Sequence, residues 1–147
     1  MFDKLIAQLE PYFTKKAPWQ IPASGREWIV NYAWIISLVL AILLVPTMLG
    51  FLTLFGILGA VAGVVYAVSP LYWLSAIALV IQFIFLVASI AGLKNKSYSK
   101  GWKIVFYGQI FGFAYGLLYF SIGSLVSGVI GLAIGLYVLF QIKSYFK

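Results

Sequence analysis

The chain has 147 residues, of which 64% are hydrophobic and 9% charged, and its mean hydropathy is +1.07. This composition excludes an ordinary soluble domain and indicates an integral membrane protein. The formal net charge is +7, but the bases lie beside apolar stretches, where membrane topology explains them without nucleic-acid binding.

The first segment predicts an amphipathic helix followed by a connector. Apolar residues from Phe2 to Phe13 recur at spacings of three and four, which places them on one helical face. That face is expected either to lie on a membrane surface or to pack on the rest of the protein. Pro11 is expected to end or bend the helix, and two further prolines make residues 17–25 an extended connector. Residues 1–24 are therefore assigned to an amphipathic interfacial helix and its proline-containing connector, with no cleavable signal peptide.

Residues 25–147 are assigned to a helical transmembrane domain. Residues 28–93 and 104–142 contain no Asp, Glu, Lys or Arg, and a spanning helix needs about 20 apolar residues. The expected spans lie near 28–49, 70–93, 102–120 and 122–143. Residues 50–69 are too apolar for a solvated loop, so they are expected to lie in the interface, to re-enter the membrane or to extend the neighbouring helices.

The basic residues decide between four and five spans. They form three groups, at the N-terminus, in the turn 92–103 and at the C-terminus. With four spans all ten bases are cytoplasmic, whereas five spans would place a group of four outside, against the positive-inside rule. We therefore predict an all-α four-helix bundle with both termini cytoplasmic, in a bacterial inner (plasma) membrane, and a five-span protein is the alternative. The turn lysines are expected to contact anionic lipid headgroups: Lys94, Lys96, Lys100 and Lys103.

Small residues recur at every fourth position in the last two predicted spans. Residues at this spacing share one helix face and let two backbones approach closely, as in a glycine zipper. The two stripes are expected to face each other in a tight hairpin, or one of them to face a partner or a second copy. They comprise Gly108, Gly112 and Gly116, and Gly123, Ser127, Gly131 and Gly135.

Three amides stand out among the few polar residues inside the spans: Asn31, Gln82 and Gln109. Gln82 lies almost halfway along its span, where an unpaired amide is costly. It is expected to hydrogen-bond to another helix, for instance to Gln109, or else to contact a solute in a pore.

The missing residue types exclude several functions. There is no histidine or cysteine, so Ser-His and Cys-His catalysis and thiolate metal sites are excluded. The only acids, Asp3, Glu10 and Glu27, are scattered near the N-terminus, and no charge lies inside a span, which argues against a proton-coupled carrier. We expect no enzyme activity, no metal and no cofactor.

The function that survives these exclusions is that of a small accessory or scaffold subunit. It would act by glycine-mediated packing with a membrane-protein partner or with itself, and its basic side would bind anionic lipids. One alternative is a channel or facilitator for a small neutral or anionic solute. A second is an accessory subunit that binds a hydrophobic cofactor or a lipid, which the lack of histidine disfavours.

Overall fold

The computed structural model of the chain describes residues 2–17, 19–62, 70–117 and 122–147. These residues form helices and turns without any β-strand, which confirms the predicted all-α class. In chain order the elements are α1 (Phe2–Thr14), α2 (Ala23–Ala62), α3 (Pro70–Lys94), the π-helical turn η2 (Tyr98–Trp102), α4 (Lys103–Gly116), α5 (Ile122–Ile142) and the 3₁₀ turn η4 (Lys143–Tyr145).

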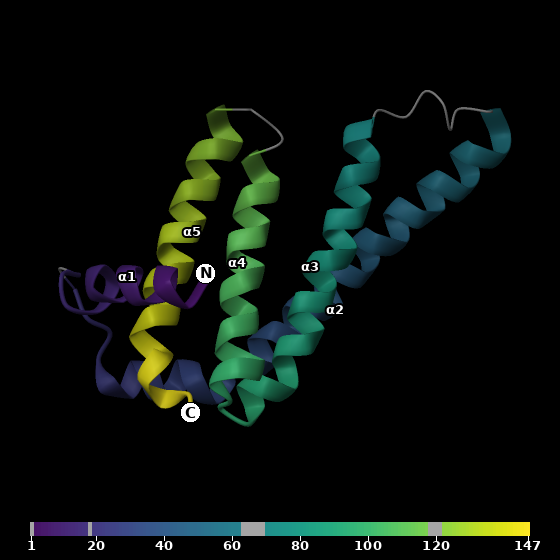
Figure 1. Ribbon diagram of the computed structural model, residues 1–147. Coiled ribbons are helices and arrows are strands. Elements are labelled where there is room, and N and C mark those ends of the chain that lie inside the picture. Colours follow the sequence, from purple (N-terminus) through teal and green to yellow (C-terminus); the bar gives the residue numbers. More distant parts are fainter. Residues whose placement is uncertain (1, 18, 63–69, 118–121) are drawn as a thin grey trace.

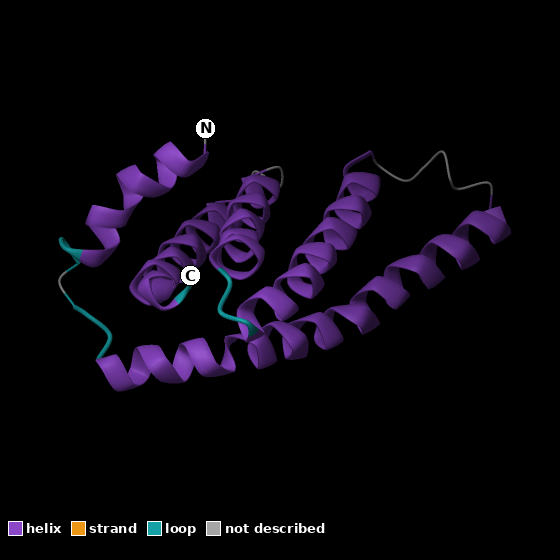
Figure 2. Cartoon of the chain, turned by 60° about the horizontal axis from the view of Figure 1, so that its bottom comes forward, coloured by secondary structure: helices purple, strands orange, loops and turns teal. Residues whose placement is uncertain are grey.

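Three helices stand in a row and a fourth crosses them. α5, α4 and α3 lie side by side, and α2 passes this row at one end before it diverges from α4 and α5 (Figure 1). In the turned view α2 runs along one side of the row, while α1 lies at the end of the row near α5 (Figure 2). The arrangement is therefore more open than a closed four-helix bundle.

Three segments of the described chain are long and apolar enough to cross a membrane. They are Ala23–Phe51, Leu74–Lys94 and Leu125–Tyr145. α4 has 14 residues, which at a rise of about 1.5 Å per residue span roughly 21 Å, less than the hydrocarbon core of about 30 Å. The π-helical turn η2 precedes it without a gap. The predicted range 102–120 ends in residues 118–120, which lie outside the described residues.

The first long helix does not end where the sequence suggested. α2 continues through Pro46 as far as Ala62, so residues 50–62 prolong this helix, which is one of the three placements expected for residues 50–69. In so apolar a run the helix supplies the only hydrogen-bond partners for the backbone, and losing one bond at Pro46 costs less than ending the helix. The other part of the predicted re-entrant or interfacial segment, residues 63–69, lies outside the described residues. By contrast, α3 and α5 match the ranges 70–93 and 122–143 to within one residue.

α1 packs on the protein through its apolar face. Ile6 is buried, and the ring of Phe13 stacks on that of Phe140 in α5 with centroids 5.5 Å apart. Gln141 Nε2 also donates a hydrogen bond of 2.8 Å to the Phe13 carbonyl. The helix continues three residues beyond Pro11, so this proline does not have the first of its two expected effects, which was to end the helix. Of the two positions expected for the apolar face, the structure has the one on the protein.

The best packed part of the core surrounds Trp102. This side chain and Phe106 are fully buried, and the Trp102 ring lies 5.5 Å from Phe106 and 5.4 Å from Phe140 between centroids. Its indole Nε1 donates a buried hydrogen bond of 2.7 Å to the Leu139 carbonyl. A buried indole N–H needs such a partner, and this bond fixes the start of α4 to the end of α5.

Glycines allow the turn between α3 and α4 to fold back on α3. Gly92 and Gly101 are both buried, and a Cβ added at Gly92 would overlap the backbone carbonyl of Lys100. Lys96, within the turn, has a positive φ of 50°. Its N–H donates to the Leu93 carbonyl, and its carbonyl accepts from the Lys147 N–H, so two hydrogen bonds hold this conformation in place. The stretch 92–103 is thus a packed structural unit as well as a group of charges.

Candidate functional site

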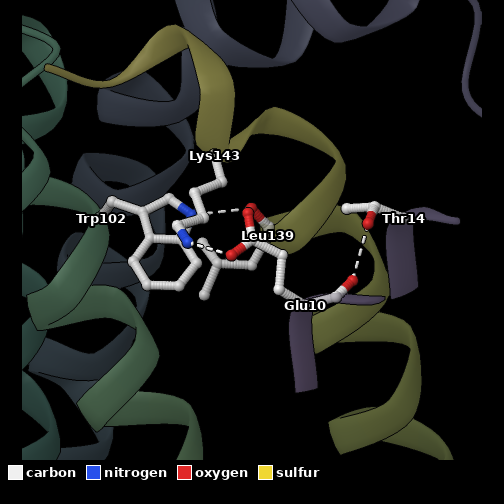
Figure 3. Close-up of polar contacts among 5 residues, drawn as sticks. All are labelled: Glu10, Thr14, Trp102, Leu139 and Lys143. Carbon is white, nitrogen blue, oxygen red and sulfur yellow. Dashed lines mark hydrogen bonds and ion pairs between the residues drawn. The ribbon is translucent and has the colours of Figure 1, made fainter. Parts of the chain in front are cut away.

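α1 brings two carboxylates to bases from two other segments. Asp3 Oδ1 lies 2.7 Å from Lys103 Nζ. Figure 3 shows the second pair, in which Glu10 Oε2 lies 2.6 Å from Lys143 Nζ. The hydrogen bond and the charge of Lys103 hold the pKa of the Asp3 carboxyl below its ordinary value. The N-terminal helix is therefore tied by charge both to the start of α4 and to the end of α5.

The C-terminus is tied to the lysine-rich turn by backbone hydrogen bonds. The Lys147 N–H donates to the Lys96 carbonyl at 3.0 Å, and the Tyr98 N–H donates to the Lys147 carbonyl at 2.8 Å. Lys143 Nζ lies over the rings of Tyr98 and Trp102, 5.8 Å from each centroid, within the range of a cation–π contact. Lys15 and Arg26 of the N-terminal group line one hollow with Lys143. Bases from the three sequence groups therefore meet at one end of the molecule, which we call the basic end.

The four turn lysines predicted to contact lipid headgroups divide into two kinds. Lys94, Lys96 and Lys100 are exposed at the basic end, with Lys94 Nζ 5.3 Å above the ring of Trp34. Lys103 is half-buried and engaged by Asp3. Three of the four side chains are thus placed where a headgroup can reach them.

The two glycine stripes do not face each other as expected. A Cβ added at Gly108 would meet Phe85 of α3 at 3.3 Å, and one at Gly112 would meet Gln82 Oε1 at 3.5 Å, so both glycines face α3. On α5, Gly135 lets the side chain of Gln109 approach, because a Cβ there would lie 2.6 Å from Gln109 Oε1. The expected contact between the stripes is not formed at Gly108 and Gly112, because helix rotation decides which neighbour a stripe meets, and the spacing of four leaves that rotation open.

The other members of the stripes face open space. Among the described residues, no atom outside the local helix lies within 4 Å of a Cβ added at Gly116, Gly123 or Gly131. Ser127 is exposed between the last two, and its hydroxyl donates to the Gly123 carbonyl at 2.8 Å. These residues of α5, Gly123, Ser127 and Gly131, are called the α5 strip below, and Gly131 also lines the smaller space of the hollow described next.

Gln82 and Gln109 line a common hollow between the helices, which we call the amide cavity. It consists of two adjoining spaces of about 330 and 230 Å³, which share both amides and Gly108. The walls come from α2, α3, α4 and α5, and Ser37 and Ser89 contribute to them. Asn31, by contrast, is exposed on α2 and does not line the hollow.

The expected interhelical hydrogen bond to the oxygen of Gln82 is not formed. Gln82 Oε1 is buried and accepts no hydrogen bond from the described residues. Ser89, which lines the same hollow, donates instead to the Leu86 carbonyl at 2.7 Å. A buried acceptor without a donor costs free energy, so this oxygen marks the amide cavity as a place where a donor group would bind favourably.

Sequence reasoning missed a second hollow, at the basic end. It measures about 720 Å³, and it lies between α1, the connector, the start of α2 and the end of α5. Lys15, Arg26 and Lys143 contribute its bases. The only sequence signal was that Lys15 and Arg26 flank the proline-containing connector, which says nothing of how the connector folds. We call it the basal cavity.

Within the described residues there is no group of three or more acidic, histidine or cysteine side chains that could hold a metal ion. No family model, curated protein or solved structure was found to match this chain.

Proposed function

We propose that the chain is a non-catalytic integral membrane protein that serves as an accessory or scaffold subunit, bound to a membrane-protein partner or to a second copy through the α5 strip. The observation that carries this proposal is the open space at Gly123, beside the exposed Ser127 one turn further along α5. Small residues at a spacing of four allow another helix to pack closely, which is the main route to helix association where lipid surrounds both helices. The hydroxyl of Ser127 is already bonded within α5, so burying this strip leaves no hydroxyl donor without a partner.

The large apolar surface of the span helices supports this proposal. In the most apolar stretches of the three span segments, 11%, 22% and 28% of the residues, in chain order, are buried inside the described structure. Val126, Ile130 and Ile134 flank the α5 strip and are more than half exposed. Such residues pack against lipid in the free subunit and around the edge of a helix contact in a complex.

We further propose four spans with both termini cytoplasmic. α2 and α4 run away from the basic end, and α3 and α5 return to it (Figure 1). A basic end that gathers bases from three parts of the sequence fits one cytoplasmic side under the positive-inside rule. In this arrangement η2 and α4 together form the third crossing.

Native co-purification tests the proposed function. The tagged chain, extracted in a mild detergent, is expected to bring down a second membrane protein or a second copy of itself. Gly123→Leu fills the α5 strip and is expected to lower recovery by about tenfold, since overpacking costs about 1 to 3 kcal/mol. Gly50→Leu is the matched control, because Gly50 is an open helical glycine on α2. A clean monomer from wild type, or equal loss in both variants, contradicts the proposal.

A facilitator for a small neutral solute is the second candidate function, and the amide cavity favours it. The unpaired Gln82 Oε1 would accept a hydrogen bond from a solute N–H or O–H, and Gln109 lies on the same hollow. Such polar groups in an apolar lining are typical of small-molecule sites.

Swelling of reconstituted vesicles tests this second candidate. We expect wild type to accelerate the entry of glycerol or urea relative to protein-free vesicles, and Gln82→Leu to remove the acceleration. Asn31→Leu is the control, because this exposed amide does not line the cavity. Identical rates in wild type and Gln82→Leu remove the amide cavity from any solute path.

A further inference from the structure

The basal cavity is built from segments that are distant in the sequence. Thr14, Lys15 and Gln20 reach it from α1 and the connector, and Phe140 and Lys143 from the end of α5. The Thr14 hydroxyl donates to the Glu10 carbonyl at 2.7 Å, and Gln20 Nε2 donates to the Thr14 carbonyl at 3.1 Å. The first bond lies within α1, and the second holds the connector against α1, so this wall of the cavity is formed without any ligand.

The charges on the cavity wall leave a surplus of bases. Lys15, Arg26 and Lys143 line it together with a single acid, Glu10. Glu10 is engaged by Lys143 at 2.6 Å. The ion pair occupies one base, and Lys15 and Arg26 supply positive charge that no described acid on the wall balances.

Arg26 also presents a donor that the fold does not use. Its Nε is buried and has no hydrogen-bond partner among the described residues. An unpaired buried donor of a charged group is costly, and an anion that accepts from it removes this cost. The planar guanidinium matches a phosphate group, which can accept two of its N–H bonds at once.

We propose that the basal cavity binds the phosphodiester headgroup of an anionic phospholipid through Arg26 and Lys15. The cavity opens at the basic end, beside the exposed lysines of the turn. Bases close to a membrane surface attract anionic lipids. Its aromatic side, formed by Tyr98, Phe140 and Phe146, offers an apolar surface to the part of the lipid next to the headgroup. This site is separate from the α5 strip, so it stands whether or not a protein partner binds there.

Native mass spectrometry of the full-length protein in a non-ionic detergent tests the site. The probes are phosphatidylglycerol, zwitterionic phosphatidylcholine, and glycerol phosphate as a soluble phosphate. We expect wild type to retain phosphatidylglycerol in preference to both other probes. Arg26→Gln is expected to weaken this binding about tenfold, as the loss of a charge-assisted hydrogen bond does, and Lys15→Gln to weaken it severalfold.

Lys100→Gln is the matched control, because it removes the same charge from an exposed lysine of the basic end that does not line the cavity. It is expected to change binding by less than about twofold, as for other exposed charges. Lys15 is exposed, so its variant keeps the test valid if Arg26→Gln fails to fold, which helical circular dichroism reveals. Equal losses in Lys15→Gln and Lys100→Gln, or equal retention of phosphatidylcholine, overturn the site. Equally tight binding of glycerol phosphate overturns the assignment to a lipid.

Discussion

Individual glycines in this chain serve different purposes that the sequence does not distinguish. Gly92 lies against the backbone of Lys100, whereas Gly50 has open space around it and Gly135 receives the side chain of Gln109. All three lie in helices of apolar composition. Spacing could predict that glycines matter for packing, but only the rotation of each helix decides what each one contacts.

The glycine pair Gly92 and Gly50 gives the first residue-scale prediction. Gly92→Ala is expected to destabilise the protein by about 1 to 3 kcal/mol, because its Cβ would overlap the Lys100 carbonyl and force the turn to shift. Gly50→Ala is expected to be neutral or to stabilise by up to about 1 kcal/mol through helix propensity. Thermal unfolding in detergent measures both. A Gly92→Ala protein as stable as wild type would show that the turn is not closely packed.

Gln82 provides the second residue-scale prediction. Gln82→Leu is expected to raise stability by about 1 kcal/mol, because it removes a buried acceptor that has no donor within the described structure. Gln109→Leu is the companion variant on the same cavity, and it is expected to cost stability, because Gln109 packs tightly on Gly135. Thermal unfolding that ranks Gln82→Leu below wild type would show that the Gln82 oxygen is satisfied.

Among the elements, α1 shows what the spacing of apolar residues can predict and what it cannot. Its spacing of apolar residues predicted an amphipathic helix correctly, but the pattern fits a lipid surface and a protein surface equally well. The structure chooses the protein because Phe13 has Phe140 to stack on and both acids find bases. The partners of Phe13 and Glu10 lie more than 100 residues away along the chain, so no local pattern can point to them.

The ion pair of Asp3 predicts that the docking of α1 depends on pH. The pKa of Asp3 is lowered in the docked state by Lys103. The pair therefore stabilises docking fully above the ordinary aspartate pKa of about 3.9, and this contribution is lost as pH falls through the lowered pKa. Because the Asp3 side chain is 75% exposed, the effect is small.

Hydrogen exchange of the α1 amides, corrected for its intrinsic pH dependence, measures this effect. Asp3→Asn is expected to lower protection at neutral pH and to converge with wild type in acid. Glu10 is present in both proteins, so the difference between them reports on Asp3 alone. A difference in amide protection between the two proteins that stays constant from neutral pH to acid contradicts the prediction.

For the whole molecule, composition alone indicated an integral membrane protein. Apolar runs predicted helices of the right type, and the bounds of α3 and α5 followed to within one residue. For residues 50–69 the sequence left three placements open, and α2 takes the one that extends a neighbouring helix as far as Ala62, since an apolar run gives the backbone no partner outside the helix. The amide and basal cavities could not be predicted, since each joins side chains from helices whose rotation the sequence leaves open.

Topology is the whole-molecule prediction that follows from the basic end. A reporter placed at Ser97 and another at the C-terminus are expected to read out on the same, cytoplasmic side, since Lys147 bonds to the turn that contains Ser97. Five spans with the turn outside would place the Ser97 reporter externally.

The proposed contact of another membrane helix with the α5 strip can be tested by photo-crosslinking in intact membranes. Ile130 beside the strip and Leu43 on α2 are both exposed apolar residues, so a photoreactive side chain fits at either position. We expect a covalent adduct of one defined mass from position 130 and none from position 43. Lipid adducts alone at position 130, or the same protein adducts from both positions, would contradict it.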